Sequence, residues 1–298
     1  MSDQADMLRR LVRSREGPIP MPDPPPLPSA RSLVFTSGKG GVGTSNLALN
    51  LAIALGEQGQ RVALVDADFG LANLDLLCGL APGCDLGDVL EKGRPLSDAI
   101  VPGPGDIRIL PGAHGTRTMA DVLGDAPKRL ARELAELEAG ADFLLIDAGS
   151  GLGSSIAALA AAAEGVVLVT TPEPTSVADA HAALRRFGRT SGPSTLRVVV
   201  NQAHSNTEAT ECLTRLSASS RQFLGMVVSP LGFVRSDTHV PLAVRSRRPF
   251  LIAYPNSLAA RNVRKLAETL IDERRPRAPR PGFFSALSAR WALGRVAS

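Results

Sequence analysis

The chain has 298 residues, of which 44% are hydrophobic and 21% are charged, and this composition is typical of a globular protein with room for one large α/β domain. No apolar run approaches the roughly 20 residues that span a membrane, and charged residues and prolines fill the opening stretch, unlike a signal peptide. The formal net charge of +4 lies entirely in residues 272–298, which hold six arginines against two acidic residues. Basic charge confined to one end of a chain predicts a local contact with an anionic surface.

The cysteines form no close pair in the sequence. They fit a reducing compartment better than a disulfide framework, a zinc site or an iron–sulfur site. We expect them to be small core or surface residues. They are Cys78, Cys84 and Cys212.

Residues 1–17 have the pattern of a short helix, with Met7, Leu8 and Leu11 on one face. A helix this short is marginal alone in water, so its apolar face needs a partner; the alternative is a disordered tail. Residues 18–30 predict a stiff linker, because the seven prolines within 18–28 give that stretch an extended length of about 35 Å at ~3.1 Å per residue.

A glycine-rich loop follows a short apolar strand at 33–35 and leads into a helix at 46–55. Strand, glycine-rich turn and helix form the context in which such a loop binds phosphate. The glycines let successive backbone N–H groups converge on an anion, and the helix N-terminus adds partial positive charge. A hydroxyl at the helix start can bind a magnesium ion held by the phosphates. The predicted binding residues are Gly38, Lys39, Gly40, Gly41, Val42, Gly43, Thr44 and Ser45, with Ser45 as the metal ligand.

This loop departs from the usual phosphate-loop pattern, which ends in Gly-Lys-Ser/Thr. Position 44 is Thr, so the lysine that normally reaches the β- and γ-phosphates is missing. Lys39 lies instead near the front of the loop, in a chain with only four lysines. A compact ammonium suits a crowded phosphate site, so a lysine at this position is informative. We expect the missing lysine to weaken phosphate binding and slow turnover without removing the site.

Carboxylates follow two apolar strands. Asp66 and Asp68 come directly after the strand at 62–65, where one can face a magnesium ion and the other can orient an attacking water. The fully apolar strand at 143–146 ends at Asp147, a second magnesium-site carboxylate. Shortly after it, Gly149 and Gly151 let the backbone approach a terminal phosphate. The simpler alternative is that Asp66 and Asp68 only cap a loop or a helix. Their position directly after the second strand of a phosphate-loop domain makes this alternative the poorer choice.

The rest of the chain alternates predicted strands and helices. A glycine- and proline-rich region at 79–125 contains one strand, and Thr175 or Ser176 can cap the helix that follows a later strand. Asn201 ends another strand and suits the edge of an adenine, although an isolated Asn at a strand end is more often structural. Predicted strands lie at 107–110, 166–169, 198–200 and 226–228, and predicted helices at 126–139, about 237–247 and 256–271. The fold class is therefore α/β, a mostly parallel twisted sheet with helices on both faces and ligands at the strand C-termini.

Residues 283–298 predict an amphipathic helix. Phe283, Phe284, Leu287 and Trp291 fall within one 100° stripe, which arginines flank. Such a stripe suits a helix lying in the headgroup region of an anionic membrane; the alternative is a helix docked on the protein's own core. The Arg- and Pro-rich spacer at 273–282 favours the membrane, because it would hold the helix away from the domain.

The loop, the Asp66–Asp68 segment and the strand ending at Asp147 together resemble the MinD/ParA family of ATPases over residues 31–272. The resemblance implies an α/β ATPase domain that binds ATP and Mg²⁺ and dimerises on ATP. Lys39 would cross the dimer interface to the partner's nucleotide, and Asp68 would position the water, which makes these two the catalytic residues. Asp66 would join Ser45 and Asp147 around the metal. Gly149 and Gly151 would form the second switch, and Asn201 would contact the adenine.

The N-terminus narrows the resemblance. Asp3-Gln4-Ala5, with Leu8 and Arg9, is similar to the D-Q-A-x-x-L-R motif of the FlhG-type flagellar regulators in this family, which stimulates the signal-recognition-particle-like GTPase FlhF. The resemblance implies a regulator of flagellar number that partners such a GTPase and basal-body components. It would be cytoplasmic and peripheral on the inner face of the membrane, and it would hydrolyse ATP slowly. Two alternatives stay open: a nucleotide-sensing scaffold that does not hydrolyse, suggested by Thr44, and a DNA-partitioning ATPase that uses the arginine tail, although nucleic acid is the less favoured partner.

Overall fold

The computed structural model describes residues 30–68, 72–112, 128–188, 195–273 and 280–296. The helix predicted at 1–17, with Asp3, Gln4, Ala5, Leu8 and Arg9, lies outside these residues, and so does nearly all of the linker predicted at 18–30. None of the described helices is both long and apolar enough to span a bilayer.

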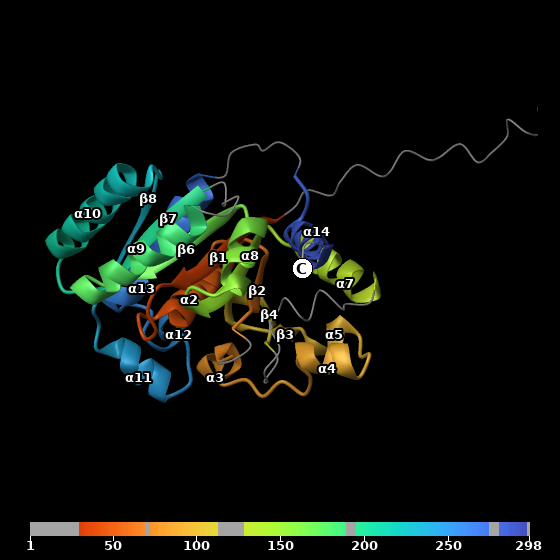
Figure 1. Ribbon diagram of the computed structural model, residues 1–298. Helices are drawn as coiled ribbons and strands as arrows, with labels where there is room; N and C mark the ends of the chain where they lie inside the picture. Colours follow the sequence, from red (N-terminus) through yellow and green to blue (C-terminus); the bar gives the residue numbers. More distant parts are fainter. Residues whose placement is uncertain (1–29, 69–71, 113–127, 189–194, 274–279, 297–298) are drawn as a thin grey trace, which may run out of the picture.

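The core is an eight-stranded sheet with the order β3-β4-β2-β5-β1-β6-β7-β8 (Figure 1). Every neighbouring pair is parallel except β3 and β4. The strands are β1 (Arg31–Ser37), β2 (Val62–Asp66), β3 (Val101–Pro102), β4 (Arg108–Leu110), β5 (Phe143–Ser150), β6 (Gly165–Thr170), β7 (Thr195–Ala203) and β8 (Ser229–Arg235). The predicted fold class is confirmed.

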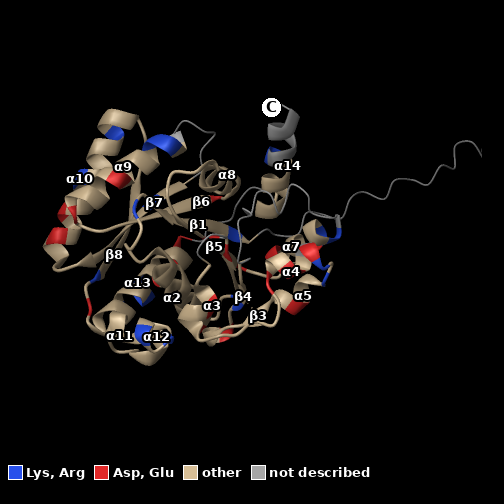
Figure 2. Ribbon diagram, turned by 60° about the horizontal axis from the view of Figure 1, so that its bottom comes forward, with Lys and Arg blue, Asp and Glu red and all other residues tan. Residues whose placement is uncertain are grey.

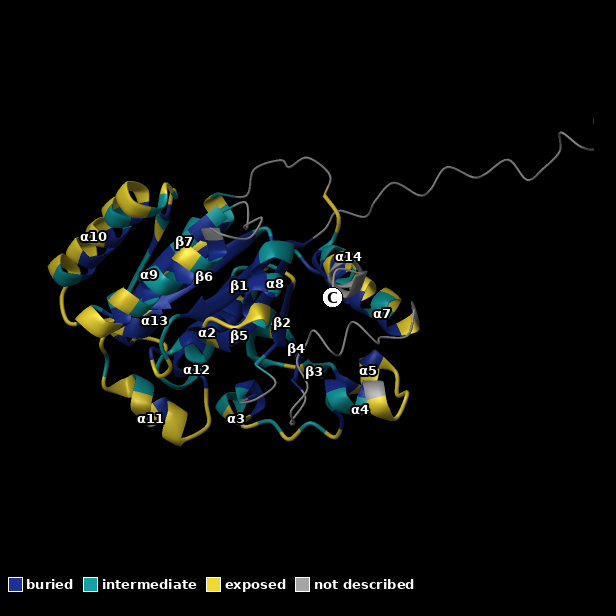
Figure 3. Ribbon diagram, in the orientation of Figure 1, coloured by how far each residue is buried: buried dark blue, intermediate teal, exposed yellow. Residues whose placement is uncertain are grey.

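Helices cover both faces of this sheet, so its central strands are apolar on both sides. Strands β1, β2 and β6 are buried along their whole length, and Figure 3 shows them in dark blue. One face packs against α2 (Thr44–Glu57), α11 (His239–Arg245), α12 (Phe250–Ala253) and α13 (Leu258–Asp272). The other packs against α7 (Lys128–Ala139), α8 (Ser154–Ala162), α9 (Pro174–Gly188), α10 (Asn206–Leu224) and α14 (Phe283–Val296).

Strand β1 lies between β5 and β6, near the centre of the sheet. The chain leaves β1 toward β2 on one side and later fills the other side with β6, β7 and β8. A crevice forms at such a switch point, beyond the carboxyl ends of the strands, and ligands of open α/β sheets bind there. The loops after β1, β2 and β5 all meet at this edge.

The region 79–112 contains more structure than its glycines and prolines suggest. Besides strand β4, which confirms the strand predicted at 107–110, it forms α4 (Leu86–Glu91), α5 (Leu96–Ala99), the short β3 and a 3₁₀ turn η1 (Pro104–Asp106); α3 (Leu74–Cys78) precedes it. Helix α4 begins with a capping box, in which the side chains of Asp85 and Asp88 each accept a hydrogen bond from the backbone N–H of the other residue. The described cysteines are free thiols, as predicted.

The last strand was predicted too early in the chain. Residues 226–228 are not a strand, and Val227 is 68% exposed. Strand β8 begins at Ser229 and contains Pro230 and Gly232, residues that argue against a strand when read from sequence. Proline is tolerated here because β8 is the edge of the sheet, where one row of backbone groups needs no strand partner.

The C-terminal helix α14 packs against α7 and α8, and this contradicts its predicted placement. The spacer at 273–282 was predicted to hold the helix away from the domain, with its aromatic stripe facing a membrane. Phe283, Phe284 and Leu287 are instead only 1–2% exposed and belong to the core. The fourth member of the stripe, Trp291, lies within α14, but its side chain is outside the described part of the structure.

Glu138 of α7 explains why this helix docks. Its carboxylate is 3% exposed, and Oε1 and Oε2 accept hydrogen bonds from the backbone N–H groups of Phe283 (2.7 Å) and Phe284 (3.3 Å). The first N–H groups of a helix have no partner within the helix, so a buried carboxylate satisfies them and favours the N-terminal end electrostatically. Burial raises the pKa of Glu138. A helical projection of 283–298 cannot reveal this partner from another helix.

Candidate functional site

The glycine-rich loop joins β1 to α2 at the switch point, as predicted. Gly43 has φ 88° and is the residue directly before α2, in the left-handed region where a side chain is strained. A Cβ there would also lie 2.6 Å from Nδ2 of Asn201. That amide donates to the carbonyl of Val42 at 2.8 Å. The glycine therefore lets β7 approach the loop closely and hold it in shape.

Thr44 and Ser37 tie the loop together from within. The Thr44 side chain is 7% exposed, and its hydroxyl donates to Oγ of Ser37 at 3.0 Å. Ser37 in turn donates to the carbonyl of Lys39 at 2.9 Å. Thr44 therefore stabilises the loop conformation but brings no positive charge to it.

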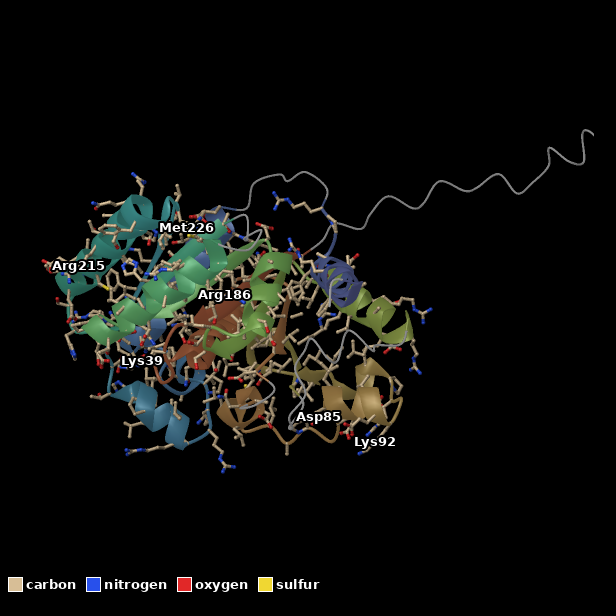
Figure 4. The ribbon with its side chains drawn as sticks, in the orientation of Figure 1. Lys39, Asp85, Lys92, Arg186, Arg215 and Met226 are labelled. Carbon is tan, nitrogen blue, oxygen red and sulfur yellow. The ribbon has the colours of Figure 1, made fainter. Side chains whose placement is uncertain are left out.

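Lys39 turns toward the beginning of α9. Its Nζ pairs with Oε2 of Glu173 at 2.9 Å and donates to Oγ1 of Thr175 at 3.2 Å (Figure 4). Lys39 is 39% and Glu173 is 65% exposed, so the ion pair is in solvent and weak. Sequence reasoning missed Glu173, although its position just after a central strand was a usable signal.

The cap predicted for the helix after β6 is wrong. Helix α9 begins at Pro174, and Thr175 accepts from Lys39 instead. The hydroxyl of Ser176 reaches back to the strand end, where it accepts from the N–H of Thr171 at 3.0 Å and pairs with Oγ1 of Thr170 at 2.9 Å.

Two buried carboxylates lie side by side on β2 and β5, where Asp66, the last residue of β2, is in register with Asp147 of β5. Oδ1 of Asp66 accepts from the N–H of Asp68 (3.1 Å), and Oδ2 accepts from the N–H groups of Asn73 (3.0 Å) and Leu74 (3.2 Å). Asp66 thus shapes the loop after β2, and its predicted metal role stays a prediction. Oδ1 of Asp147 accepts from the N–H of Gly149 at 3.1 Å. Oδ2 of Asp147 is buried without a hydrogen-bond partner among the described residues.

Burial raises the pKa of both acids, and the charge of a neighbouring carboxylate adds to it, Asp147 for Asp66 and Asp68 for Asp147. The pKa of Asp66 rises to about 7, mainly through burial and then through the charge of Asp147. Burial is also the main reason that the pKa of Asp147 rises to about 6, against a lowering by hydrogen bonds from Ser45 and the N–H of Gly149. Two carboxylates that are buried away from water favour the binding of a cation beside them.

The unliganded protein is expected to lose the stabilising contribution of this pair as pH rises from about 4 to about 7. In that window the folded state binds more protons than the unfolded state, whose aspartates titrate near 3.8, so the free energy of unfolding falls with pH. The urea midpoint is measured at pH 4.5 and at pH 7.5, without magnesium or nucleotide. Between these two pH values, the change in midpoint should be more destabilising in wild type than in Asp147→Asn. Equal changes in the two proteins would contradict this assignment.

A pocket of about 530 Å³ opens above the loop, and we call it the loop pocket. Asp68 reaches it from the segment after β2, and a Cβ on Gly149 would lie only 2.1 Å from Oδ2 of Asp68. Gly149 has φ 65°, so this close approach and the backbone turn both require glycine. The other described residues that line the loop pocket are Ser37, Gly40, Gly41, Gly43, Thr44, Ser45, Asn46, Asn73, Leu76, Leu77, Ser150, Val244 and Arg247.

A second pocket of about 410 Å³ adjoins the loop on its β8 side, and we call it the α11 pocket. Asn201 lines it, as the adenine prediction requires, but one N–H of its amide already donates to Val42. Adenine contact by Asn201 therefore stays a prediction. Sequence reasoning missed the remaining wall because it lies on the misplaced strand and on unremarkable helix residues: Gln202, Val234, Arg235, Ser236, Asp237, Val240, Pro241, Val244, Arg245 and Phe250.

The structure brings most predicted site residues together. Gly40, Gly41, Gly43, Thr44 and Ser45 line the loop pocket, with Asp68 and Gly149 facing them. Gly38 packs against the backbone of α9, Val42 is buried, and Lys39 points away. Gly151 does not line the loop pocket, and its N–H donates to the carbonyl of Ser37 at 2.9 Å.

The donor set fits a magnesium ion. Mg²⁺ prefers oxygen ligands and usually takes only one or two from protein, with water and phosphate as the rest. The unpartnered buried Oδ2 of Asp147 and the nearby hydroxyl of Ser45 are such ligands. Among the described residues, no three His, Cys, Asp or Glu side chains cluster in a way that could hold a metal unaided.

Known proteins are similar to this chain in sequence and in fold. A model of the CobQ/CobB/MinD/ParA nucleotide binding domain matches residues 33–250. The chain is 36% identical to the antiactivator FleN of Pseudomonas aeruginosa, over 83% of this chain and 89% of FleN. It is 28% identical to the flagellum site-determining protein YlxH of Helicobacter pylori, over 82% and 83% of the two chains. The structure of septum site-determining protein MinD from Pyrococcus horikoshii, complexed with Mg-ADP, matches with a TM-score of 0.64 and 28% identity, over 82% of this chain and 96% of MinD.

Proposed function

The chain belongs to the CobQ/CobB/MinD/ParA nucleotide-binding family, and on that premise we propose that it is an ATP-dependent regulator of flagellar number or placement. Bound Mg·ATP would join two copies into a dimer, and slow hydrolysis would separate them. The similarity to FleN and YlxH, whose names refer to an antiactivator and to the siting of flagella, supports the flagellar role.

The main observation in support of the proposed dimer is the position of Lys39. Lys39 is exposed beside its own loop and lines neither the loop pocket nor the α11 pocket; a solvent-exposed ion pair with Glu173 and a hydrogen bond to Thr175 hold it. Exposed ion pairs of this kind contribute about 0–1 kcal/mol, so little energy opposes the replacement of Glu173 by another partner of Lys39. A triphosphate on a second copy would offer the ammonium a stronger, less hydrated partner.

In this proposal the loop pocket holds the phosphates and the α11 pocket the nucleoside. When bound, Mg·ATP supplies the phosphoanhydride bond that is hydrolysed. Backbone N–H groups of the loop bind the phosphates, and Ser45 and Asp147 hold the metal. Asp68 orients the attacking water from the opposite wall, and Gly149 gives it room.

Further partners remain proposals. Residues 1–17 would stimulate an FlhF-like GTPase, and basal-body components would be the eventual targets. Contact with an anionic membrane would require α14 to leave α7 and α8, because Phe283, Phe284 and Leu287 are buried there. The protein would then be cytoplasmic and only peripherally bound to the inner face of the membrane.

Size-exclusion chromatography with light scattering tests the proposal. The mass should double from 31.2 kDa on addition of Mg·ATP, and Lys39→Glu should stay monomeric under the same conditions. The matched control is Lys92→Glu, since Lys92 is an exposed lysine directly after the distant helix α4. A wild-type mass unaffected by Mg·ATP, or a Lys39→Glu dimer, would overturn the proposal.

A further inference from the structure

The loop pocket has little positive charge for a site that would bind a triphosphate. Thr44 stands where a phosphate loop usually has its lysine, and its hydroxyl is engaged with Ser37. Lys39 is paired with Glu173 outside the pocket. Among the described residues that line the loop pocket, only Asp68 and Arg247 carry a charge, and Arg247 is the only cation.

Arg247 occupies a backbone position that normally calls for glycine. Its φ is 52°, in the left-handed region. Directly after α11, the N–H of Arg247 donates to the carbonyl of Val244 (3.0 Å), and the N–H of Arg248 donates to that of Ala243 (3.1 Å). These two bonds form a Schellman motif with Arg247 as the residue just past the helix end. A non-glycine residue is strained there, so an arginine at this position lowers the stability of the turn relative to glycine.

The surroundings fix this turn at the mouth of the loop pocket. Gly79, at the end of α3, lies so close that a Cβ on it would be 2.8 Å from the carbonyl oxygen of Arg247. The Arg247 side chain is exposed, and no described residue forms an ion pair or a hydrogen bond with it. Figure 2 shows basic residues gathered where α11 leads into α12. Arg245 lines the α11 pocket, Arg247 the loop pocket, and Arg248 neither.

We propose that Arg247 contacts the phosphates of the bound nucleotide and supplies, from the same chain, the positive charge that the loop lacks at position 44. A guanidinium forms paired hydrogen bonds to phosphate oxygens and keeps its charge at any physiological pH, so it can replace an ammonium at a phosphate from outside the loop. This role rests on the proposed nucleotide-binding function. It makes Arg247 a phosphate-binding residue on a turn that comes from the opposite wall of the pocket.

Nucleotide titrations of Arg247→Gly test the proposal. Glycine suits the left-handed turn, so the variant should melt at the wild-type temperature or above it, and weaker binding cannot then reflect misfolding. Fluorescent ATP, ADP and AMP analogues with Mg²⁺ should bind Arg247→Gly more weakly in proportion to phosphate number, by roughly tenfold for ATP and hardly at all for AMP. Arg248→Gly removes a neighbouring arginine that lines neither pocket, so this variant should bind all three nucleotides as wild type does.

Restoring the missing lysine sharpens the test. In Thr44→Lys, the loop carries its own cation, so adding Arg247→Gly should weaken ATP binding by much less than it does in wild type. Equal ATP affinity of wild type and Arg247→Gly would overturn the role of Arg247 and leave the nucleotide-binding function standing. An equal loss for ATP and AMP would also overturn it, since the contact would then not be to the added phosphates. If the wild-type protein bound none of the three, both the inference and the proposed function would fall.

Discussion

Replacing Asp68 with alanine is expected to lower single-turnover ATP hydrolysis by about 10²–10⁴-fold and to leave the ATP-dependent dimer intact. The carboxylate lines the loop pocket against Gly149, on the wall opposite the loop, where a water attacking a terminal phosphate would lie. Its removal takes away the group that orients this water. It also takes away a negative charge close to Asp147, so nucleotide should bind at least as well.

Phosphate release from preformed Mg·ATP complexes measures the effect, and light scattering on the same samples measures the dimer. Glu136→Ala is the matched control, because Glu136 is an exposed carboxylate of α7 far from the pocket. Equal hydrolysis in wild type and Asp68→Ala would refute the role of Asp68 and favour a nucleotide-sensing protein that does not hydrolyse. Loss of the dimer in Asp68→Ala would instead show that the residue acts in binding.

Phe284→Ala is expected to lower the free energy of unfolding by ~3–5 kcal/mol, the cost of truncating a buried aromatic side chain. Phe284 is 2% exposed in the core that α14 forms with α7 and α8, and its ring meets that of Phe283 edge to face at 5.1 Å between centroids. A helix that lay free until it met a membrane would contribute nothing to the stability of the domain in water.

Urea denaturation without lipid measures this loss, and the chain offers a matched control. Phe223, near the end of α10, is 75% exposed, so Phe223→Ala should change the free energy of unfolding by less than ~0.5 kcal/mol. If both variants unfolded at the wild-type urea concentration, α14 would not be docked in solution. The placement first predicted for the helix would then be the correct one.

The fold and the main parts of the site could be predicted because their signals are local. An apolar strand, a glycine-rich turn and a helix are contiguous in the sequence, and Asp66 and Asp147 each directly follow an apolar run that is buried within its strand. Parallel strands then bring these separate ends to one edge without further information.

Features that depend on distant partners could not be predicted in this way. The docking of α14 depends on Glu138, which precedes Phe283 by 145 residues. Strand β8 carries Pro230 because it is at the edge of the sheet, which its own sequence does not say. Lys39 was expected to cross to another subunit, but its resting partner Glu173 depends on how α9 packs. Arg247 looks like one of several surface arginines until its backbone conformation is known.

Both margins of the sheet are closed to further strands. At one margin β3 has only two residues, and at the other β8 contains a proline, which has no N–H to donate. Natural sheets use short or proline-bearing outer strands to prevent chains from stacking edge to edge. In the part of the chain that the structure describes, neither margin therefore offers two molecules a ready route to a continuous intermolecular sheet. In the proposed dimer, association would instead use the rim that carries the loop and Lys39, and self-assembly would follow the cell's supply of nucleotide.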